Sequence, residues 1–549
     1  MTSPLKSLRS LNLSKKLIAA FLTVALVPIV VIISIALYKA STALEQQAYS
    51  QLAAVGEIKK SAVRRHFENV KDNLYALTIN PKTAEASQQF IDGFNQIDGL
   101  VGKPQSLQRY YQQDFNSKFK AENPNQAVPV DIINGLNSQA LELQARYISD
   151  NPNPLGEKIK LVSTGHQDSY DLAHQNFHPF FAEIADIYDL YDIFIVDNQS
   201  GNIVYSVYKE LDFATSLTSG PYANSNIATV FNQAKDLFSQ SEFAFVDYQQ
   251  YVPSYNAPAS FIAAPIIYEG APQATLIFQL SIDALNNIMT EREGLGETGE
   301  TYLVGPDGLM RSDSYLDPDN HSVINSFKYP SKGSVDTEAF ILAMSGQEGE
   351  KVITDYNGQP VLSAYRQLNV LGHNWALLAE IDEKEAFAAV TTLRNLLLLI
   401  FIVTIALIIT VAVFFARSLT QPVHDLMATM RRVEKEGDFS LRAPVSSKDE
   451  IGRCAVAFNS LLEALQTSIS ASNRVLNQMA DGKFHDRIKV ECKGELNTGR
   501  LNTADVQRRD GETVICCVRG TNDTVGDVEV ILRDPGDHIL AQRLGQGAQ

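Results

Sequence analysis

The sequence predicts an α+β protein: two antiparallel-sheet modules on a long N-terminal helix, two membrane-spanning helices, and a helical coiled coil after the second span. Three observations predict this architecture. Apolar runs at residues 17–38 and 396–415 contain no Asp, Glu, Lys or Arg, and each has about the 20 residues that a helix needs to cross a bilayer. Strand-like runs occur in two sets between them, and apolar residues follow helical spacing after them.

The charges before the first apolar run predict its orientation. Four basic residues and no acid precede it, namely Lys6, Arg9, Lys15 and Lys16. Because basic segments stay on the cytoplasmic side, we expect residues 1–16 in the cytoplasm and residues 39–393 exported. A cleaved signal peptide is the alternative for the first run, but its apolar stretch is longer than usual for one and a second span follows.

The composition fits an exported region and argues against nucleic-acid binding there. Residues 41–394 contain 44 Asp and Glu against 23 Lys and Arg, so this region carries the excess of acid in a chain of net charge −17. That charge disfavours nucleic-acid binding. All four cysteines, Cys454, Cys492, Cys516 and Cys517, follow the second apolar run. The exported region therefore needs hydrophobic cores rather than disulfides, and its length suits two domains.

The exported region reads as helices followed by two sets of strands. An apolar stripe from Leu44 to Leu77 predicts a helix continuing from the first span, and residues 80–160 are expected to be helical. The first set of strands is predicted at residues 191–196, 203–207, 242–248, 260–268 and 275–282. The second set is predicted at residues 302–304, 351–355, 361–368 and 375–381, with 351–355 and 361–368 as central strands. Each set ends before a helix that we expect Asp283 or Asp382 to cap.

The strand pattern and three motifs resemble a known sensor family. The motifs are residues 191–209, the Glu-Leu-Asp-Phe at 210–213 and the Gly-Leu-Gly-Glu-Thr-Gly-Glu-Thr-Tyr-Leu-Val at 294–304. Together they resemble the double Cache sensor domains of bacterial chemoreceptors, over roughly residues 40–393. The resemblance implies two PAS-like modules in the periplasm, a distal one at about 80–290 and a membrane-proximal one at about 291–385. Similar domains also front kinases and cyclases.

The segment after the second span resembles a HAMP relay module at residues 416–468. The resemblance rests on Pro422, on Gly-Asp-Phe-Ser-Leu-Arg at 437–442 and on Asp-Glu-Ile-Gly at 449–452, which makes Pro422, Glu450 and Gly452 candidate relay residues. Two such short apolar-striped helices bury too little alone, so the pattern predicts a homodimeric coiled coil. A partial second copy is predicted at residues 469–496, where Gly482 to Arg487 repeats the earlier spacing.

The last part of the chain, residues 497–549, departs from every helical pattern. Gly, Arg and Asp interrupt each register, and the long helical hairpin expected of a chemoreceptor is not there. A frameshift or truncated gene model is one interpretation. A small β domain built on residues 514–518 and 528–532 is the other.

Motifs for metal, nucleotide or catalytic chemistry have simpler interpretations. Residues 294–299 match G-x-G-x-x-G, but they precede a strand instead of following one, so a tight entry into the second sheet is preferred to a nucleotide site. Asp313, Asp317 and Asp319 do not have calcium-loop spacing. His174 and His178 are four apart without a third ligand. We expect no enzyme activity, no metal and no cofactor.

Ligand recognition is the chemistry that the sequence favours. By the resemblance, the distal pocket lies between the sheet and the segment joining its second and third strands. That segment and the last strand supply the candidates, Tyr208, Lys209, Asp212, Tyr222, Asp247, Tyr248, Tyr255 and Gln279. Lys209 would favour a carboxylate. The Arg-x-Trp-Tyr signature of amino-acid-binding relatives is missing, and Gln279 stands where those relatives carry an Asp.

These observations predict a homodimeric chemoreceptor of the bacterial inner membrane. It would bind a small ligand outside and pass the signal through HAMP helices, with a chemotaxis adaptor and kinase as partners only of a full-length form. The alternative is the sensory front of a histidine kinase or nucleotide cyclase. A receptor fragment that signals only by pairing with full-length chains is a third possibility.

Overall fold

The computed structural model describes residues 12–129 and 131–480, together with the short strands β10 to β13 in the last 50 residues. Residues 36–395 form one compact unit, and the other described residues form a second. β10 (Asn502–Thr503) pairs with β11 (Val518–Arg519), and β12 (Glu529–Arg533) pairs with β13 (Ile539–Arg543). The predicted repeat at 482–487 and residues 1–11, which are predicted to be cytoplasmic, lie outside the described residues.

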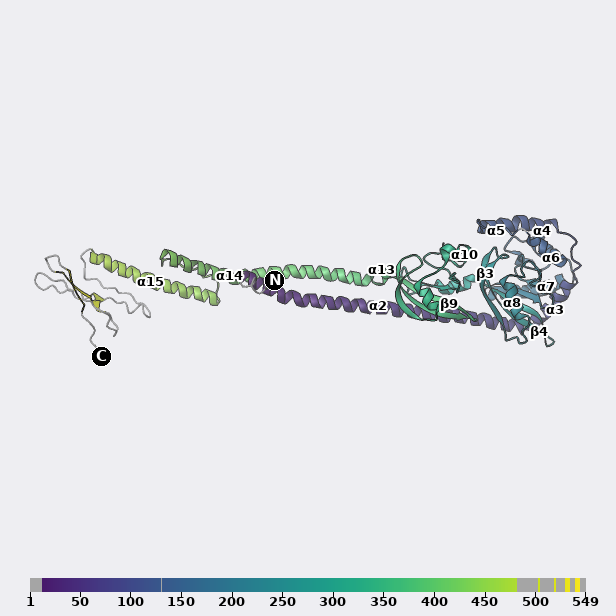
Figure 1. Ribbon diagram of the computed structural model, residues 1–549, viewed down its shortest axis with the longest axis horizontal. Coiled ribbons are helices and arrows are strands. Elements are labelled where there is room, and N and C mark those ends of the chain that lie inside the picture. The colour runs from purple at the N-terminus through teal and green to yellow at the C-terminus, as the bar shows by residue number, and fades with distance from the viewer. Residues whose placement is uncertain are drawn as a thin grey trace. The chain divides into compact units, whose positions relative to one another are not determined.

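Two long helices contain the predicted membrane spans. α2 runs Leu13–Thr78 and α14 runs Ala388–Glu436, with Pro28 and Pro422 inside them. By length and composition each is able to cross a membrane. The part of α2 from residue 36 onward belongs to the same unit as the sheets and lies along both of them (Figure 1). Its apolar stripe is buried there as predicted, at Val63, Phe67, Val70, Leu74 and Leu77.

A set of helices follows α2 and covers the first sheet. Asn80 caps the first of them through its side chain, which accepts from the Lys82 N–H, and Pro81 occupies the first turn. The helical character predicted for residues 80–160 is confirmed. The helices are α3 (Pro81–Asn95), α4 (Gln105–Arg109), the π-helix η1 (Tyr110–Phe115), α5 (Asn116–Glu122), η2 (Ile132–Gly135), α6 (Ser138–Gln144), the π-helix η3 (Ala145–Ser149), η4 (Lys158–Lys160) and α7 (Ser169–Ile187).

The distal module contains a five-stranded antiparallel sheet of order β2-β1-β5-β4-β3. All five predicted strands are present. They are β1 (Leu190–Asp197), β2 (Ile203–Ser206), β3 (Ala244–Tyr251), β4 (Ala257–Tyr268) and β5 (Ala271–Leu280). α8 (Asn226–Ala234) packs on β3 and β4, while α3 and α7 contact β2 and β1. Because both faces are covered, the strands read as nearly continuous apolar runs instead of alternating ones.

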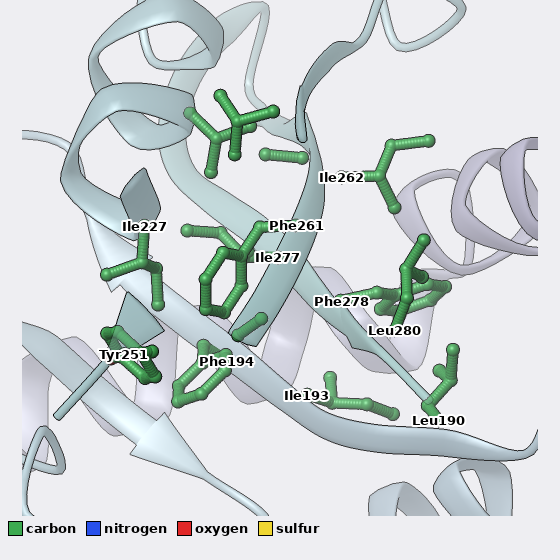
Figure 2. Packing of buried hydrophobic residues seen from close by; sticks show 14 of the residues in the cluster. Leu190, Ile193, Phe194, Ile227, Tyr251, Phe261, Ile262, Ile277, Phe278 and Leu280 are labelled. Carbon is green, nitrogen blue, oxygen red and sulfur yellow. The ribbon is translucent and has the colours of Figure 1, made fainter. Parts of the chain in front are cut away.

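Figure 2 shows how alternate residues of these strands fill two layers of core. Phe194 and Phe261 point to the side of Ile227 from α8, with their ring centroids 6.3 Å apart. Ile193 and Ile262 point to the opposite side, because successive side chains of a strand face opposite ways. These residues are at most 1% exposed.

The membrane-proximal module contains a four-stranded sheet of order β6-β9-β8-β7. Its strands are β6 (Glu300–Val304), β7 (Gly349–Thr354), β8 (Pro360–Val370) and β9 (His373–Asp382), and α12 (Glu338–Met344) packs on β8. The prediction that residues 351–355 form a central strand is wrong. β7 is an edge strand and four of its six residues are exposed. It pairs with β8, which is central as predicted, and the other central strand is β9, whose apolar run pairs with both β6 and β8.

The ends of both sheets differ from the predicted capping. α9 (Ile282–Met289) begins after Ser281, so Asp283 lies in its first turn rather than at the cap. α13 (Glu383–Ala386) does begin after Asp382, but no side-chain cap bond forms. Asp283 therefore contributes through the helix dipole at most. Two short helices, α10 (Val323–Lys328) and α11 (Pro330–Gly333), complete this module.

In the second unit, α15 (Glu450–Ala480) follows α14 after an irregular connection. Asp449 organises the start of α15, because its Oδ1 accepts the N–H groups of Ile451 and Gly452. Asn459 ties the connection down by exchanging two bonds with Ala443, at 2.7 and 2.8 Å. The helical pattern predicted after the second span is confirmed.

Candidate functional site

A cavity of about 270 Å³ opens in the distal module at the predicted face of the sheet. It is bounded by the start of β1, by the segment after β2, by the turn after β3 and by the helical segments η1 and α5. Three of the predicted residues line it, Tyr208, Lys209 and Tyr255. The structure adds Tyr110, Phe115, Lys118, Leu155, Gly156, Lys158, Asp189, Leu190, Tyr191, Glu210, Leu211, Pro253 and Ser281.

Two residues that line the cavity, Lys209 and Tyr255, have unusual backbone conformations. Lys209 has φ 57° and Tyr255 has φ 56°, in the left-handed region that non-glycine residues rarely adopt. Lys209 comes three residues after the end of β2, and Tyr255 comes four residues after the end of β3. Such conformations persist only where the surroundings hold them, and they gather at functional sites.

Lys209 is only 2% exposed, and its ammonium already has partners. It donates to the Ser206 carbonyl oxygen and lies 4.4 Å from the centre of the Tyr205 ring. Burial lowers the pKa of Lys209, while the Asp192 carboxylate opposes that shift. Its side chain is thus a poor free anchor for an anion, which weakens the expectation that it selects a carboxylate.

Two buried carboxylates, Asp192 and Asp212, accompany the two buried lysines of this site, Lys158 and Lys209. Asp192 is fully buried and accepts the N–H groups of Ile193 and Val207, at 2.7 and 2.8 Å. Burial raises the pKa of Glu210, and neighbouring Asp212 raises it further. Burial also raises the pKa of Asp212 to about 6, although the Tyr251 hydroxyl donates to it at 2.5 Å. Because burial raises the pKa of both Glu210 and Asp212, hydrogen-bond donors or positive charge brought by a ligand would stabilise their charged forms.

Several buried polar atoms near the cavity have no hydrogen-bond partner among the described residues. They include Asp212 Oδ1, the Tyr222 hydroxyl and Gln279 Oε1. Gln279 belongs to the same network as the cavity wall, because its Nε2 donates to Ser254 Oγ at 3.1 Å and Ser254 donates to Glu210 at 3.0 Å. Unpartnered buried polar groups are costly, so a site that contains several is built to receive more partners.

Two of the predicted ligand residues lie elsewhere. The Asp247 carboxylate accepts Nε and Nη2 of Arg311, both at 2.9 Å, and Nε1 of Trp375 at 3.1 Å. The Tyr248 ring lies 6.3 Å from the Trp375 ring. Neither residue lines the cavity. A register shift in β3 between Val246 and Gln249 turns both toward the proximal module, and no local sequence signal reveals such a bulge.

His174 and His178 of α7 form a packed pair. The rings of His174 and His178 stack at 4.3 Å, and His178 is bound at both nitrogens, by the Tyr205 hydroxyl and the Ile159 carbonyl oxygen. Burial lowers the pKa of His178 to about 3, and the Lys209 charge adds to that effect. Both are therefore neutral. Among the described residues, no group of three His, Cys, Asp or Glu is placed to hold a metal ion.

A larger cavity of about 620 Å³ lies on the helical side of the distal module. Arg146 is its main cationic group, but Arg146 already pairs with Glu142 and with Asp168. An anion would compete with both carboxylates. We therefore centre the candidate ligand site on the smaller cavity.

The predicted relay residues lie in the second unit with distinct geometries. Pro422 sits inside α14 without ending it, and Glu450 is the first residue of α15. Gly452 packs against the connection so closely that a Cβ there would lie 1.8 Å from the Ser447 carbonyl oxygen. A side chain at position 452 would push α15 away from the connection. Asp449 and Asn459, which sequence reasoning did not single out, make the ordering bonds.

Sequence reasoning also missed Tyr110, Tyr191 and Glu210. Tyr191 donates to Glu210 at 2.8 Å and stacks on Tyr208 with ring centroids 5.9 Å apart. Tyr110 comes from η1, in the helical region whose fold the sequence did not reveal. Glu210 was detectable, since it directly follows Lys209 in the Glu-Leu-Asp-Phe motif.

Comparison with known proteins adds the family to this geometry. A Cache domain family model matches residues 40–390, and a HAMP domain model matches residues 414–467. This chain belongs to the Cache domain family. The chain is similar to a probable chemoreceptor of Sinorhizobium fredii, 26% identical over 341 residues, which cover 61% of this chain and 41% of the relative.

Two further similarities concern sensor proteins. Methyl-accepting chemotaxis protein PctB of Pseudomonas aeruginosa is 26% identical over 236 residues, which cover 42% of this chain and 34% of that relative. The periplasmic sensory domain of the Campylobacter jejuni chemoreceptor Tlp1 matches with TM-score 0.29 and 13% identity, over 50% of this chain and 98% of that one. This Cache protein thus spans about two-fifths of the length of the first relative and a third of the second.

Proposed function

We propose that this chain is the sensing and relay part of a transmembrane chemoreceptor. Two of its relatives are named a probable chemoreceptor and a methyl-accepting chemotaxis protein, and its Cache and HAMP matches adjoin two helices that are able to cross a membrane. Proteins of this kind signal without catalysing a reaction. A bacterial inner-membrane location, with the Cache domain in the periplasm, follows from the same relatives.

The finer organisation is part of the proposal. We assign spans to residues 17–38 and 396–415, PAS-like modules to about 80–290 and 291–385, and the HAMP module to 416–468. A homodimer is supported by apolar side chains that α15 leaves exposed, among them Val456, Leu461 and Leu476, which are 50–60% exposed. An apolar stripe of this kind is buried by a second helix pair in a coiled coil. A chemotaxis adaptor and kinase would be the partners of a longer form.

The observation that carries the proposal is the distal cavity with its unsatisfied acceptors. Tyr208, Lys209 and Tyr255 line the cavity and would contact the ligand directly, while Asp212, Tyr222 and Gln279, which do not line it, would form the polar surroundings of the site. A small molecule with an ammonium or several N–H or O–H donors would satisfy them. Asp247 and Tyr248 would hold the two modules together instead.

A thermal-shift screen of residues 36–395 against small amines, acids and purines tests this function. A ligand that binds only the folded state raises the melting temperature in proportion to its saturation. We expect a shift with a donor-bearing compound. Absence of a shift with all three classes would contradict direct small-molecule sensing.

Tyr208→Ala tests the position of the site once a ligand shifts the melting temperature. Tyr208 is only half-buried and contributes a ring to the wall, so its removal should weaken binding about tenfold or more without unfolding the domain. Tyr268→Ala is the control, because Tyr268 ends β4 with 38% of its side chain exposed and does not line the cavity. Equal affinities of the two variants would remove Tyr208 from the site.

A further inference from the structure

The glycine-rich loop at residues 294–299 binds a carboxylate of this same chain. The N–H groups of Glu297 and Thr298 donate to Glu385 at 2.7 Å each, and the Thr298 hydroxyl donates at 2.5 Å. A loop that points successive N–H groups at one place is an anion site. The loop has the letters of a phosphate-binding motif, but its anion here is the side chain of α13.

Glycine is required at the point of closest approach. Gly296 has φ 75°, and a Cβ there would lie 2.2 Å from Glu385 Oε1. Burial opposes ionisation of Glu385, but the bonds from Thr298 and Glu297 outweigh it and lower its pKa. The carboxylate is therefore charged, and its bonds to the loop are of the stronger, charge-assisted kind.

Arg292 braces the loop from behind. Its guanidinium donates to the carbonyl oxygens of Gly299 at 2.9 Å and Gly296 at 3.1 Å, and also to that of Glu297. The Thr298 hydroxyl in turn accepts the N–H of Asp382, the residue before α13, at 3.1 Å. The loop and the start of α13 are thus held by bonds in both directions.

The same stretch is tied to α2 and to the distal module. Lys59 of α2, which is 5% exposed, donates to the carbonyl oxygens of Ile288 at 2.6 Å and Glu291 at 2.8 Å, so it closes the C-terminal end of α9. Gln51 of α2 donates to the Gly294 carbonyl oxygen. α9 begins two residues after β5 ends, and β5 is a central strand of the distal sheet.

We propose that residues 290–299 are a joint that couples the distal module, α2 and α13, and that Glu385 is the latch holding α13 to it. α13 ends two residues before α14 begins, and α14 contains the second candidate span. A shift of α9 would move the loop against α2 and carry α13 with it. Only the idea that this movement carries a signal rests on the proposed function.

Hydrogen–deuterium exchange of the full chain in lipid nanodiscs tests the joint without any ligand. Glu385→Ala removes the acceptor, so the amides of Glu297 and Thr298 should exchange about tenfold faster or more. The proposal further requires acceleration on both sides, at the Thr290 amide that closes α9 and at the Phe387 amide that closes α13. Gly296→Ala should give the same pattern while leaving the carboxylate in place.

Glu383→Ala is the matched control, because Glu383 is an acid of the same short helix without a side-chain bond to the loop. It should leave all four amides at the wild-type rate. Unchanged exchange at Glu297 and Thr298 in Glu385→Ala would overturn the latch. Acceleration confined to those two amides would overturn the joint. Because no ligand is added, either result is independent of whether the distal cavity binds a small molecule.

Discussion

The two sheet modules differ in how many of their buried side-chain polar atoms lack a partner. Among the described residues, the proximal module leaves only Arg366 Nε unpartnered. In the distal module, Asp212, Tyr222 and Gln279 keep buried atoms without partners. In the proximal module, Glu300 and Glu380 face each other across β6 and β9, and their oxygens are bonded. Glu380 accepts from Ser363 at 2.7 Å and Tyr302 at 2.9 Å, while Glu300 accepts from Tyr356 and from Ser314 at 2.8 Å.

The two modules contain similar antiparallel sheets, and this difference suggests different roles for them. An unsatisfied buried group lowers stability unless a ligand supplies its partner, whereas a satisfied network makes the packing specific. This difference is the reason for placing the proposed ligand site in the distal module. In the proposed coupling, the proximal module stays rigid and transmits the movement of residues 290–299.

The largest expected effect concerns the ion pair between the modules. Arg311→Met leaves the Asp247 carboxylate without its bidentate partner, and Arg311 is only 1% exposed. Breaking a buried pair in this way typically costs about 3–5 kcal/mol. Urea unfolding of residues 36–395 measures the loss, and Arg311→Met combined with Asp247→Asn should recover part of it.

The exposed pair of Lys351 and Glu338 provides the control for Arg311. Lys351→Met should change the free energy of unfolding far less, because solvent screens a pair whose side chains are about half exposed. If Arg311→Met costs no more than Lys351→Met, the two modules are not held together by this pair.

The second effect is a pH dependence located in the proximal module. Burial raises the pKa of Glu380 from 4.5 to about 7, although Ser363 and Tyr302 donate to it. Between these values the folded state keeps a proton that the unfolded chain has released. The free energy of unfolding should therefore fall as pH rises from about 4.5 to 7, by up to about 1.4 kcal/mol per pH unit. Glu380→Gln should remove this slope in chemical denaturation at several pH values.

The slope of the wild type contains contributions from other groups, so the difference between wild type and variant is the quantity to compare. His178 acts with the opposite sign, because its lowered pKa makes stability fall as pH drops from 6.5 toward about 3. An unchanged slope in Glu380→Gln would show that Glu380 ionises equally in the folded and unfolded states.

The smallest effect compares one tyrosine hydroxyl in each module. Tyr302→Phe removes the donor to buried Glu380 and should cost about 1–3 kcal/mol. Tyr222→Phe removes a hydroxyl that has no partner among the described residues, so stability should be unchanged or raised by up to about 1 kcal/mol. Urea unfolding of both variants checks this. Equal losses would erase the proposed difference between the modules.

Much of the fold was predictable, because the relevant signals are local. Apolar runs and turn residues gave all five distal strands, and the stripe of Val63, Phe67 and Val70 gave the buried face of α2. The position of β7 at a sheet edge was missed, although Glu350 and Lys351 are charged side chains of the kind that edge strands carry. Three of the eight candidate ligand residues line the cavity. Two of them, Tyr208 and Lys209, were predictable because the loop motif that carries them is local.

The sequence by itself determined the strands, the two apolar helices long enough to cross a membrane and the helical segment after them, because period, length and turn chemistry act within a few residues. Tertiary structure alone decided what the polar residues do. A bulge in β3 turns Asp247 away from the cavity and toward Arg311. Glu385, which comes 86 positions after Gly299, is the anion that the glycine loop binds. Such partners are far apart in the chain, and only folding brings their charges and donors within bonding distance.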